Sequence, residues 1–124
     1  MQKKDRNPTS TPEWKALGAH YRQMQEVHLR TLFKKDPYRA ARMSVAAAGL
    51  YLDYSKNRVT DATVKKLLAL AEARGLRAAI EAMFSGQRIN ETENRPVLHV
   101  ALRNRSSAPI RVAGRDVIAE INAV

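Results

Sequence analysis

Apolar residues recur at helical spacing near the start of the chain. The repeating positions, three or four residues apart, are Trp14, Leu17, Tyr21, Met24 and His28. This spacing predicts one amphipathic helix that ends near Phe33. Ser10 or Thr11 can cap its start, and Pro12 suits its first turn. His20 lies on the same helix, where a packing or solvated histidine is a better interpretation than a metal ligand.

The pattern then changes from helical spacing to alternation. Asp36-Pro37 stops the first helix and can start a short second one. The alternating apolar positions that follow are Leu50, Leu52 and Tyr54. They predict a half-buried strand, with Gly49 in a hairpin turn and Ser44–Ala47 as the partner strand. The alanine-rich residues 41–50 are also compatible with a helix, but we favour the hairpin.

Two further segments with apolar residues at helical spacing follow the hairpin. Thr60 caps the first helix and Gly75 ends it, and Gly86 ends the second helix. The apolar positions of the first are Val64, Leu67, Leu68 and Ala71, and those of the second are Leu76, Ala79, Ile80, Met83 and Phe84. We expect these two helices to bury facing stripes against each other.

The last part of the chain begins with a short extended connection between Pro109 and Gly114. Asp116 then starts another helical pattern, formed by Val117, Ile118, Ile121 and Val124. No helix-stop signal follows this pattern, so we expect the chain to be a piece of a longer protein. The predicted fold class is α+β, mostly helical with one small β-hairpin. Residues 1–10 are predicted to be a flexible tail, and residues 11–124 to form the folded segment.

Residues 90–104 allow two interpretations. As a strand, Leu98, Val100 and Leu102 would share a face. As a helix, Thr92 would cap the first turn, which would contain Glu93. We prefer the helix, which places three basic residues on one face at a spacing of four: Arg95, His99 and Arg103. That face is either a basic surface without a role or a face that meets an anion and supports an active site.

The net charge of +10 raises the question of a nucleic-acid partner. Basic residues exceed acidic ones by five in residues 1–35 and by five in the remaining residues. The charge is therefore spread along the chain, which argues against a dedicated nucleic-acid surface. A free-standing basic helical module that binds nucleic acid or an acidic partner remains an alternative.

Several kinds of chemistry have no support in the sequence. The chain has no cysteine, which excludes disulfides and thiolate metal sites. The first residues lack the apolar core of a signal peptide, and no stretch suits a membrane span. No hydrolase, phosphate-loop or dinucleotide motif occurs, and the histidines lack metal-ligand spacing. We therefore expect a soluble, cytoplasmic protein without a metal site and without catalytic residues of its own.

Three strings resemble the N-terminal region of the phosphoglucose isomerase (glucose-6-phosphate isomerase) family. They are LFKKDPYRAARMSV (32–45), LYLDYSKNRVT (50–60) and AMFSGQRINETENRPVLHVALRN (82–104). The resemblance extends from about Trp14 to Val124. The family usually has alanine after the motif arginine, where this chain has Pro96.

The resemblance implies a cytoplasmic enzyme of glycolysis and gluconeogenesis. It implies that the enzyme interconverts glucose 6-phosphate and fructose 6-phosphate through an enediol, without a metal or nucleotide cofactor. It also implies a homodimer of longer chains with two α/β sugar-isomerase domains, no nucleic-acid or membrane partner, and catalytic groups downstream of Val124. In this chain Arg95 and His99 would support the site, Thr92 and Glu93 would cap a helix, and the piece alone would be inactive.

Overall fold

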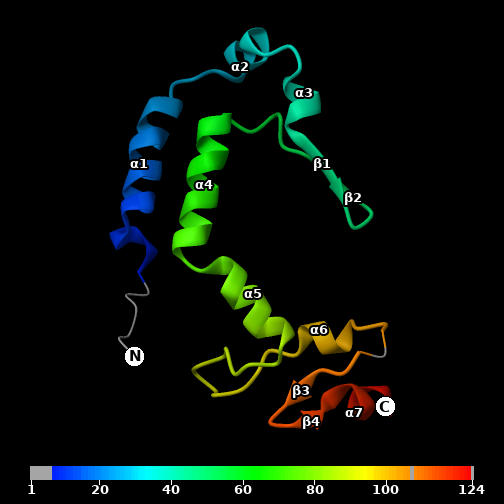
Figure 1. Cartoon of the computed structure of the whole chain (residues 1–124). Coiled ribbons are helices and arrows are strands. Elements are labelled where there is room, and N and C mark those ends of the chain that lie inside the picture. Colours follow the sequence, from blue (N-terminus) through cyan, green and yellow to red (C-terminus); the bar gives the residue numbers. More distant parts are fainter. Residues whose placement is uncertain (1–6, 107, 124) are drawn as a thin grey trace. The chain divides into compact units, whose positions relative to one another are not determined.

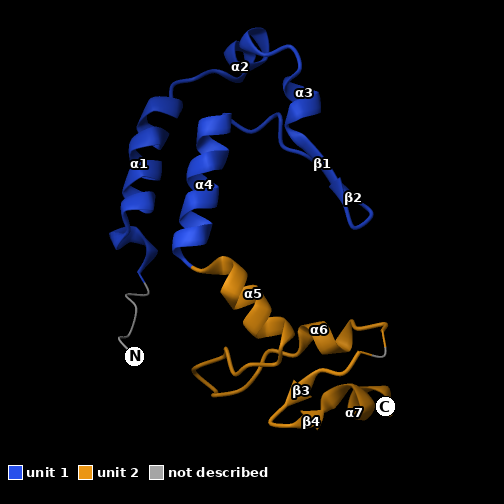
Figure 2. Ribbon diagram, in the orientation of Figure 1, with its two compact units in different colours: residues 1–74 blue, residues 75–124 orange. Residues whose placement is uncertain are grey.

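The computed structural model describes residues 7–106 and 108–123, and the chain divides into two units, residues 1–74 and 75–124 (Figure 2). The first unit contains η1 (Pro8–Ser10), α1 (Pro12–Met24), α2 (Leu29–Lys35), α3 (Arg39–Arg42), β1 (Ser44–Ala47), β2 (Leu50–Asp53) and α4 (Asp61–Ala73). The second contains α5 (Leu76–Phe84), α6 (His99–Leu102), β3 (Arg111–Val112), β4 (Arg115–Asp116) and α7 (Val117–Asn122) (Figure 1). The predicted α+β, mostly helical class is confirmed. Of the predicted tail, residues 1–6 lie outside the described residues.

The prediction of one helix from residue 12 to Phe33 is wrong. Thr11 caps α1, as expected, by accepting a hydrogen bond from the Trp14 N–H. The helix ends at Met24, and α2 begins at Leu29. His28 separates them because its backbone is extended and its Nδ1 accepts the Arg30 N–H at 3.1 Å. The His28 side chain thus caps the start of α2, and α1 does not continue through this position.

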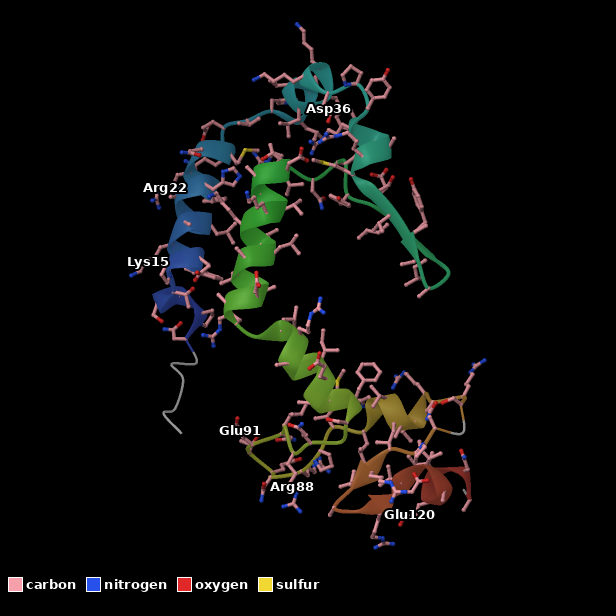
Figure 3. All side chains as sticks on the ribbon, viewed as in Figure 1. Lys15, Arg22, Asp36, Arg88, Glu91 and Glu120 are labelled. Carbon is pink, nitrogen blue, oxygen red and sulfur yellow. The ribbon has the colours of Figure 1, made fainter. Side chains whose placement is uncertain are left out.

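Helices α1 and α4 lie side by side in the first unit (Figure 1). The buried His20 of α1 joins them through a hydrogen bond between its Nε2 and the Thr63 Oγ1, at 2.7 Å. Lys15 and Arg22 project from the side of α1 that faces away from α4 (Figure 3). The interpretation of His20 as a helix-packing residue is therefore confirmed.

Arg39 organises the loop that leads into α4. Its guanidinium is buried, with 2% of the residue exposed, and it lies 5.7 Å from the centre of the Phe33 ring. Its Nε donates to the Ser55 carbonyl at 2.7 Å. Its Nη2 donates to the carbonyls of Asn57 and Val59, both at 2.8 Å. These three bonds to one side chain hold the loop between β2 and α4 in place.

The predicted hairpin is confirmed in position, but its predicted burial is wrong. Strands β1 and β2 are antiparallel, and the turn residues Ala48 and Gly49 both have positive φ, at 52° and 74°. Two positive φ values match the twist that a two-residue hairpin turn needs. Leu50 and Leu52, which we expected to face a core, are 75% and 58% exposed. The sequence pattern therefore located the strands, while the described residues of the first unit leave them exposed.

The ends of α4 agree with prediction. Thr60 and Thr63 form a reciprocal capping box at its start. Gly75 follows its last turn in the left-handed conformation, with φ of 68°. Helix α4 packs against α1 within the first unit, and the expected burial of facing stripes on α4 and α5, which belong to different units, stays a prediction. Exposed members of the two predicted stripes are Leu67, Leu68, Leu76, Ile80 and Phe84.

In the second unit, α6 packs against α7, and Ala101 and Ile118 are buried there. Asp116 caps α7 as predicted, accepting the Ile118 N–H at 3.0 Å, while Val124 of the predicted stripe lies outside the described residues. The extended connection before Asp116 is a second hairpin, β3–β4, that the sequence analysis did not predict. Gly86, with φ of 72°, passes close to this hairpin. A Cβ at that position would lie 2.9 Å from the Arg111 carbonyl oxygen.

Candidate functional site

The candidate site residues lie in the second unit, in a loop and in the short helix that follows it. The loop begins after α5 and carries Arg88 and Glu91 (Figure 3). Asn90 and Arg95 close it through two backbone hydrogen bonds of 3.1 Å each. Residues 96–98 then lead into α6. The predicted helix is confirmed only over His99–Leu102 and its predicted start at Thr92 is wrong, while the alternative strand across residues 98–102 does not form.

Thr92 and Glu93 serve the loop rather than a helix cap. The Asn90 Oδ1 accepts the Thr92 hydroxyl at 3.0 Å and the Glu93 N–H at 3.2 Å. The Asn90 Nδ2 donates to the Glu93 carboxylate at 3.1 Å, and that carboxylate also pairs with Arg95. The Asn90 side chain thus accepts hydrogen bonds from the Thr92 hydroxyl and the Glu93 N–H, so these groups do not form the predicted helix cap. Asn94 adopts φ of 50°, which asparagine tolerates better than most residues.

Pro96 supplies the physical reason why a helix does not run through this stretch. A residue that precedes proline is disfavoured in the helical region, and here Arg95 lies in the bridge to Asn90. Helix α6 starts only at His99, after Leu98, which makes no side-chain cap. The predicted face of three basic residues is therefore wrong, because Arg95 lies outside the helix that carries His99. Arg103 remains close, and its Nη1 donates to the His99 carbonyl at 3.2 Å.

His99 and Arg103 line an open depression of about 1000 Å³. The other residues that line it are Met83, Phe84, Val100, Asn104, Arg105, Ser106, Ala108, Pro109 and Ile110. Three of these lining residues are arginine or histidine, and none of them is acidic. The depression therefore combines an apolar floor with groups that can bind an anion or an acidic surface. Arg95, the other predicted supporting residue, is not among the lining residues.

Asn104 holds the loop that forms one wall of this depression, a role that the sequence analysis missed. Its Oδ1 accepts the Ser106 N–H at 2.9 Å and the Ser106 hydroxyl at 2.6 Å. Its Nδ2 donates to the Ala108 carbonyl at 3.0 Å. The signal in the sequence was an asparagine two residues before a serine, directly after the end of a helix pattern.

A second, smaller hollow of about 460 Å³ lies in the first unit. Trp14, Leu17 and Met24 give it an apolar lining, and His20 and Thr63 also border it. The His20–Thr63 hydrogen bond occupies the polar groups of both side chains that face each other there. This hollow thus shows packing chemistry rather than a cluster of reactive groups.

Two features are absent from residues 7–106 and 108–123. No group of three or more histidine, aspartate or glutamate side chains in that range could hold a metal ion. Over the same residues, no helix has both the length and the apolar character needed to cross a bilayer.

Comparison with known proteins gives one consistent result. Residues 53–124 match the family model described as phosphoglucose isomerase. Over 116 residues the chain is 61% identical to a glucose-6-phosphate isomerase of Roseiflexus castenholzii. It is 55% identical over 116 residues to glucose-6-phosphate isomerase 1 of Chromobacterium violaceum, and 53% to the glucose-6-phosphate isomerase of Gloeobacter violaceus. Each match covers 94% of this chain and 21% of the relative, so the chain spans about a fifth of the relatives' length.

Proposed function

This chain belongs to the phosphoglucose isomerase family, and on that basis we propose that it is the N-terminal part of an enzyme that interconverts glucose 6-phosphate and fructose 6-phosphate. The observation that carries the proposal is the 61% identity over 94% of the chain to a protein with that activity in its name. The alternative of a free-standing basic module is not favoured, because the matching family model and the relatives named above are isomerases.

The reaction moves a proton between two neighbouring carbons of the opened sugar. A base takes the C2 proton of the aldose while O1 gains a proton, which gives an enediol. C1 then gains a proton while the O2 hydroxyl loses one, so the ketose forms with no atom gained or lost. Such a step needs a positioned base and groups that stabilise the developing oxyanion. We propose that these groups lie in the remaining four-fifths of the enzyme, in sugar-isomerase domains that follow residues 11–124, and that this chain alone is inactive.

We further propose that His99 and Arg95 are positioning residues for that site. His99 lines the depression in the second unit, and Arg95 is held by Glu93 and by the bridge to Asn90. Neither residue is proposed to carry the reacting proton. The complete protein is proposed to be a cytoplasmic homodimer that takes a sugar phosphate and has no nucleic-acid or membrane partner.

A fused protein tests the proposed function. This chain replaces the matching fifth of the Roseiflexus castenholzii isomerase, and the product is assayed for interconversion of the two sugar phosphates. We expect turnover by the fused protein and none by the 124-residue chain. Turnover by the isolated chain, or a folded fused protein without activity, would contradict the proposal.

The positioning role needs its own variants in the fused protein. We expect His99→Ala and Arg95→Ala each to lower kcat by roughly tenfold with little change in KM. The control is Arg22→Ala, because Arg22 projects from α1 away from α4 (Figure 3). A loss of melting temperature without any change in kcat would show that the two residues are structural only.

A further inference from the structure

One face of the β1–β2 hairpin is entirely apolar. The strand register pairs Val45 with Leu52 and Ala47 with Leu50. Directly paired residues share a face, and neighbours along a strand alternate between faces. Val45, Ala47, Leu50 and Leu52 therefore form one face, which we call the hairpin face. Tyr51 and Asp53 lie on the opposite face, with Ala46 and Ser44.

The hairpin face is exposed in this chain. Val45 is 50% exposed, Leu52 58% and Leu50 75%. Among the described residues each of the two strands pairs only with the other. A two-stranded hairpin alone is marginally stable in water, and a contiguous exposed apolar face marks an interaction surface. The hairpin face therefore needs a cover that the described residues of the first unit do not provide.

The comparisons show how much further chain accompanies the matched segment in the relatives. The chain covers 21% of each relative that it matches, so the hairpin in those proteins coexists with roughly four times as much additional chain. A second copy of this chain fits less well, because it carries the same net charge of +10 and would be repelled.

We propose that the hairpin face docks onto the remaining four-fifths of the family protein. The inference rests on the proposed function, since it assumes that this chain is joined to such a segment. It adds a specific contact: Val45, Leu50 and Leu52 become buried against the downstream domains, while Tyr51 stays outside that contact. The hairpin then acts as the attachment point of the first unit.

The test compares two lysine variants in the fused protein described above. Leu52→Lys places a charge on the hairpin face, and Tyr51→Lys places the same charge on the neighbouring residue of the opposite face. We expect Leu52→Lys to lower the melting temperature by about 5 °C or more, and Tyr51→Lys to change it by less than about 2 °C. Equal effects of the two variants would overturn the assignment of the docking face.

Hydrogen exchange gives a second measurement that does not depend on a variant folding. The backbone amides of residues 45–52 are followed in the isolated chain and in the unsubstituted fused protein. We expect at least roughly tenfold slower exchange in the fused protein. Equal exchange in the two proteins would overturn the proposal, as would a dimer of the isolated chain that Leu52→Lys dissociates.

The outcomes separate this inference from the proposed function. An active fused protein whose hairpin amides exchange rapidly would leave the isomerase proposal standing and remove the docking surface. An inactive fused protein with protected hairpin amides would contradict the isomerase proposal and leave the docking surface standing.

Discussion

At the scale of single residues, Arg39 is held firmly within the first unit. It is buried and supplies three hydrogen bonds to the carbonyls of Ser55, Asn57 and Val59. Replacing it by methionine keeps the apolar stem but leaves these acceptors without their donor. Because unsatisfied buried acceptors are costly, we expect Arg39→Met to lower the free energy of unfolding by about 3 kcal/mol.

Urea unfolding followed by circular dichroism measures that loss. The control is Arg30→Met on α2, since Arg30 is exposed. We expect the control to change the free energy of unfolding by less than about 0.5 kcal/mol. A loss for Arg39→Met no larger than that of the control would show that the loop before α4 keeps its shape without the guanidinium.

Asp53 gives the first unit a defined response to acid. The Ser55 hydroxyl and the Ser55 backbone N–H both donate hydrogen bonds to its carboxylate, and they lower the pKa of Asp53 below its usual 3.8. A lowered pKa in the folded state stabilises the fold above the unfolded-state pKa. That contribution disappears as the pH falls below about 4 and through the lower folded-state pKa.

The variant Asp53→Asn isolates this effect. We expect it to be less stable than the unsubstituted chain at pH 6, and the difference to shrink at pH 3. Thermal unfolding at the two pH values measures the difference, and Glu26→Gln, which changes an exposed acid on another segment, serves as the control. A difference that stays constant between pH 6 and pH 3 would contradict the role of the carboxylate.

At the scale of elements, the turn of the β1–β2 hairpin contains a residue that is unfavourable for its backbone conformation. Ala48 has φ of 52°, a left-handed conformation that costs alanine free energy. Gly49 has φ of 74°, and glycine adopts such a conformation without steric cost. Asparagine is preferred before glycine in such a turn. We expect Ala48→Asn to stabilise the hairpin by up to about 1 kcal/mol, read as slower amide exchange at residues 45–52. No slowing, or slowing of similar size for Ala46→Asn within the strand, would contradict this.

Gly86 sets the contact between the end of α5 and the β3–β4 hairpin. An added Cβ would meet the Arg111 carbonyl at 2.9 Å, and the positive φ adds strain of its own. We expect Gly86→Ala to cost roughly 2 kcal/mol or more in the stability of the second unit.

The matched control for Gly86 is Gly18→Ala in α1, where a Cβ would meet nothing within 4 Å. That variant should be neutral or stabilising by up to about 1 kcal/mol, because alanine favours helix. Equal stability of the two variants in urea unfolding would contradict the close approach at Gly86.

Elements whose signals are local were predictable from the sequence. Thr60 and Gly75 bound α4 as expected, and Asp116 starts α7. The errors arose where a side chain competed with the backbone pattern. His28 caps α2 within a run of apolar residues at helical spacing. Asn90 accepts hydrogen bonds from Thr92 and Glu93 and holds them in a loop. Such competition depends on geometry that spacing alone does not describe.

The candidate site was predictable only in part, because side chains compete with the backbone pattern there as well. The sequence directed attention to His99, which lines the depression of the second unit. It gave no indication that Arg95 would leave that helix for a bridge with Asn90, or that Asn104 would hold the wall. The supporting roles of Arg95 and His99 stay predictions until the fused enzyme is assayed.

At the scale of the whole molecule, the net charge of +10 has a limited consequence. Basic residues are spread along the chain rather than gathered in one segment, so only sequence-independent attraction to phosphates is available. We expect binding to duplex DNA at physiological salt to be no tighter than about 1 µM, and to weaken steeply as salt is raised.

Fluorescence anisotropy with two unrelated duplexes measures this binding. The two duplexes should give the same affinity at each salt concentration. A preference for one duplex that persists at physiological salt would contradict the prediction and revive the basic-module alternative.

The uncovered hairpin face also has a consequence in time. At the N-terminal position proposed for this chain, the hairpin would emerge tens of seconds before the last of the remaining four-fifths, because synthesis adds about 5–20 residues per second. During that interval Leu50 and Leu52 are exposed to solvent on a pair of strands with free edges. Such a strand pair is open to association with a neighbouring nascent chain. The first hairpin is therefore the place where a chaperone that shields apolar strands would act during synthesis.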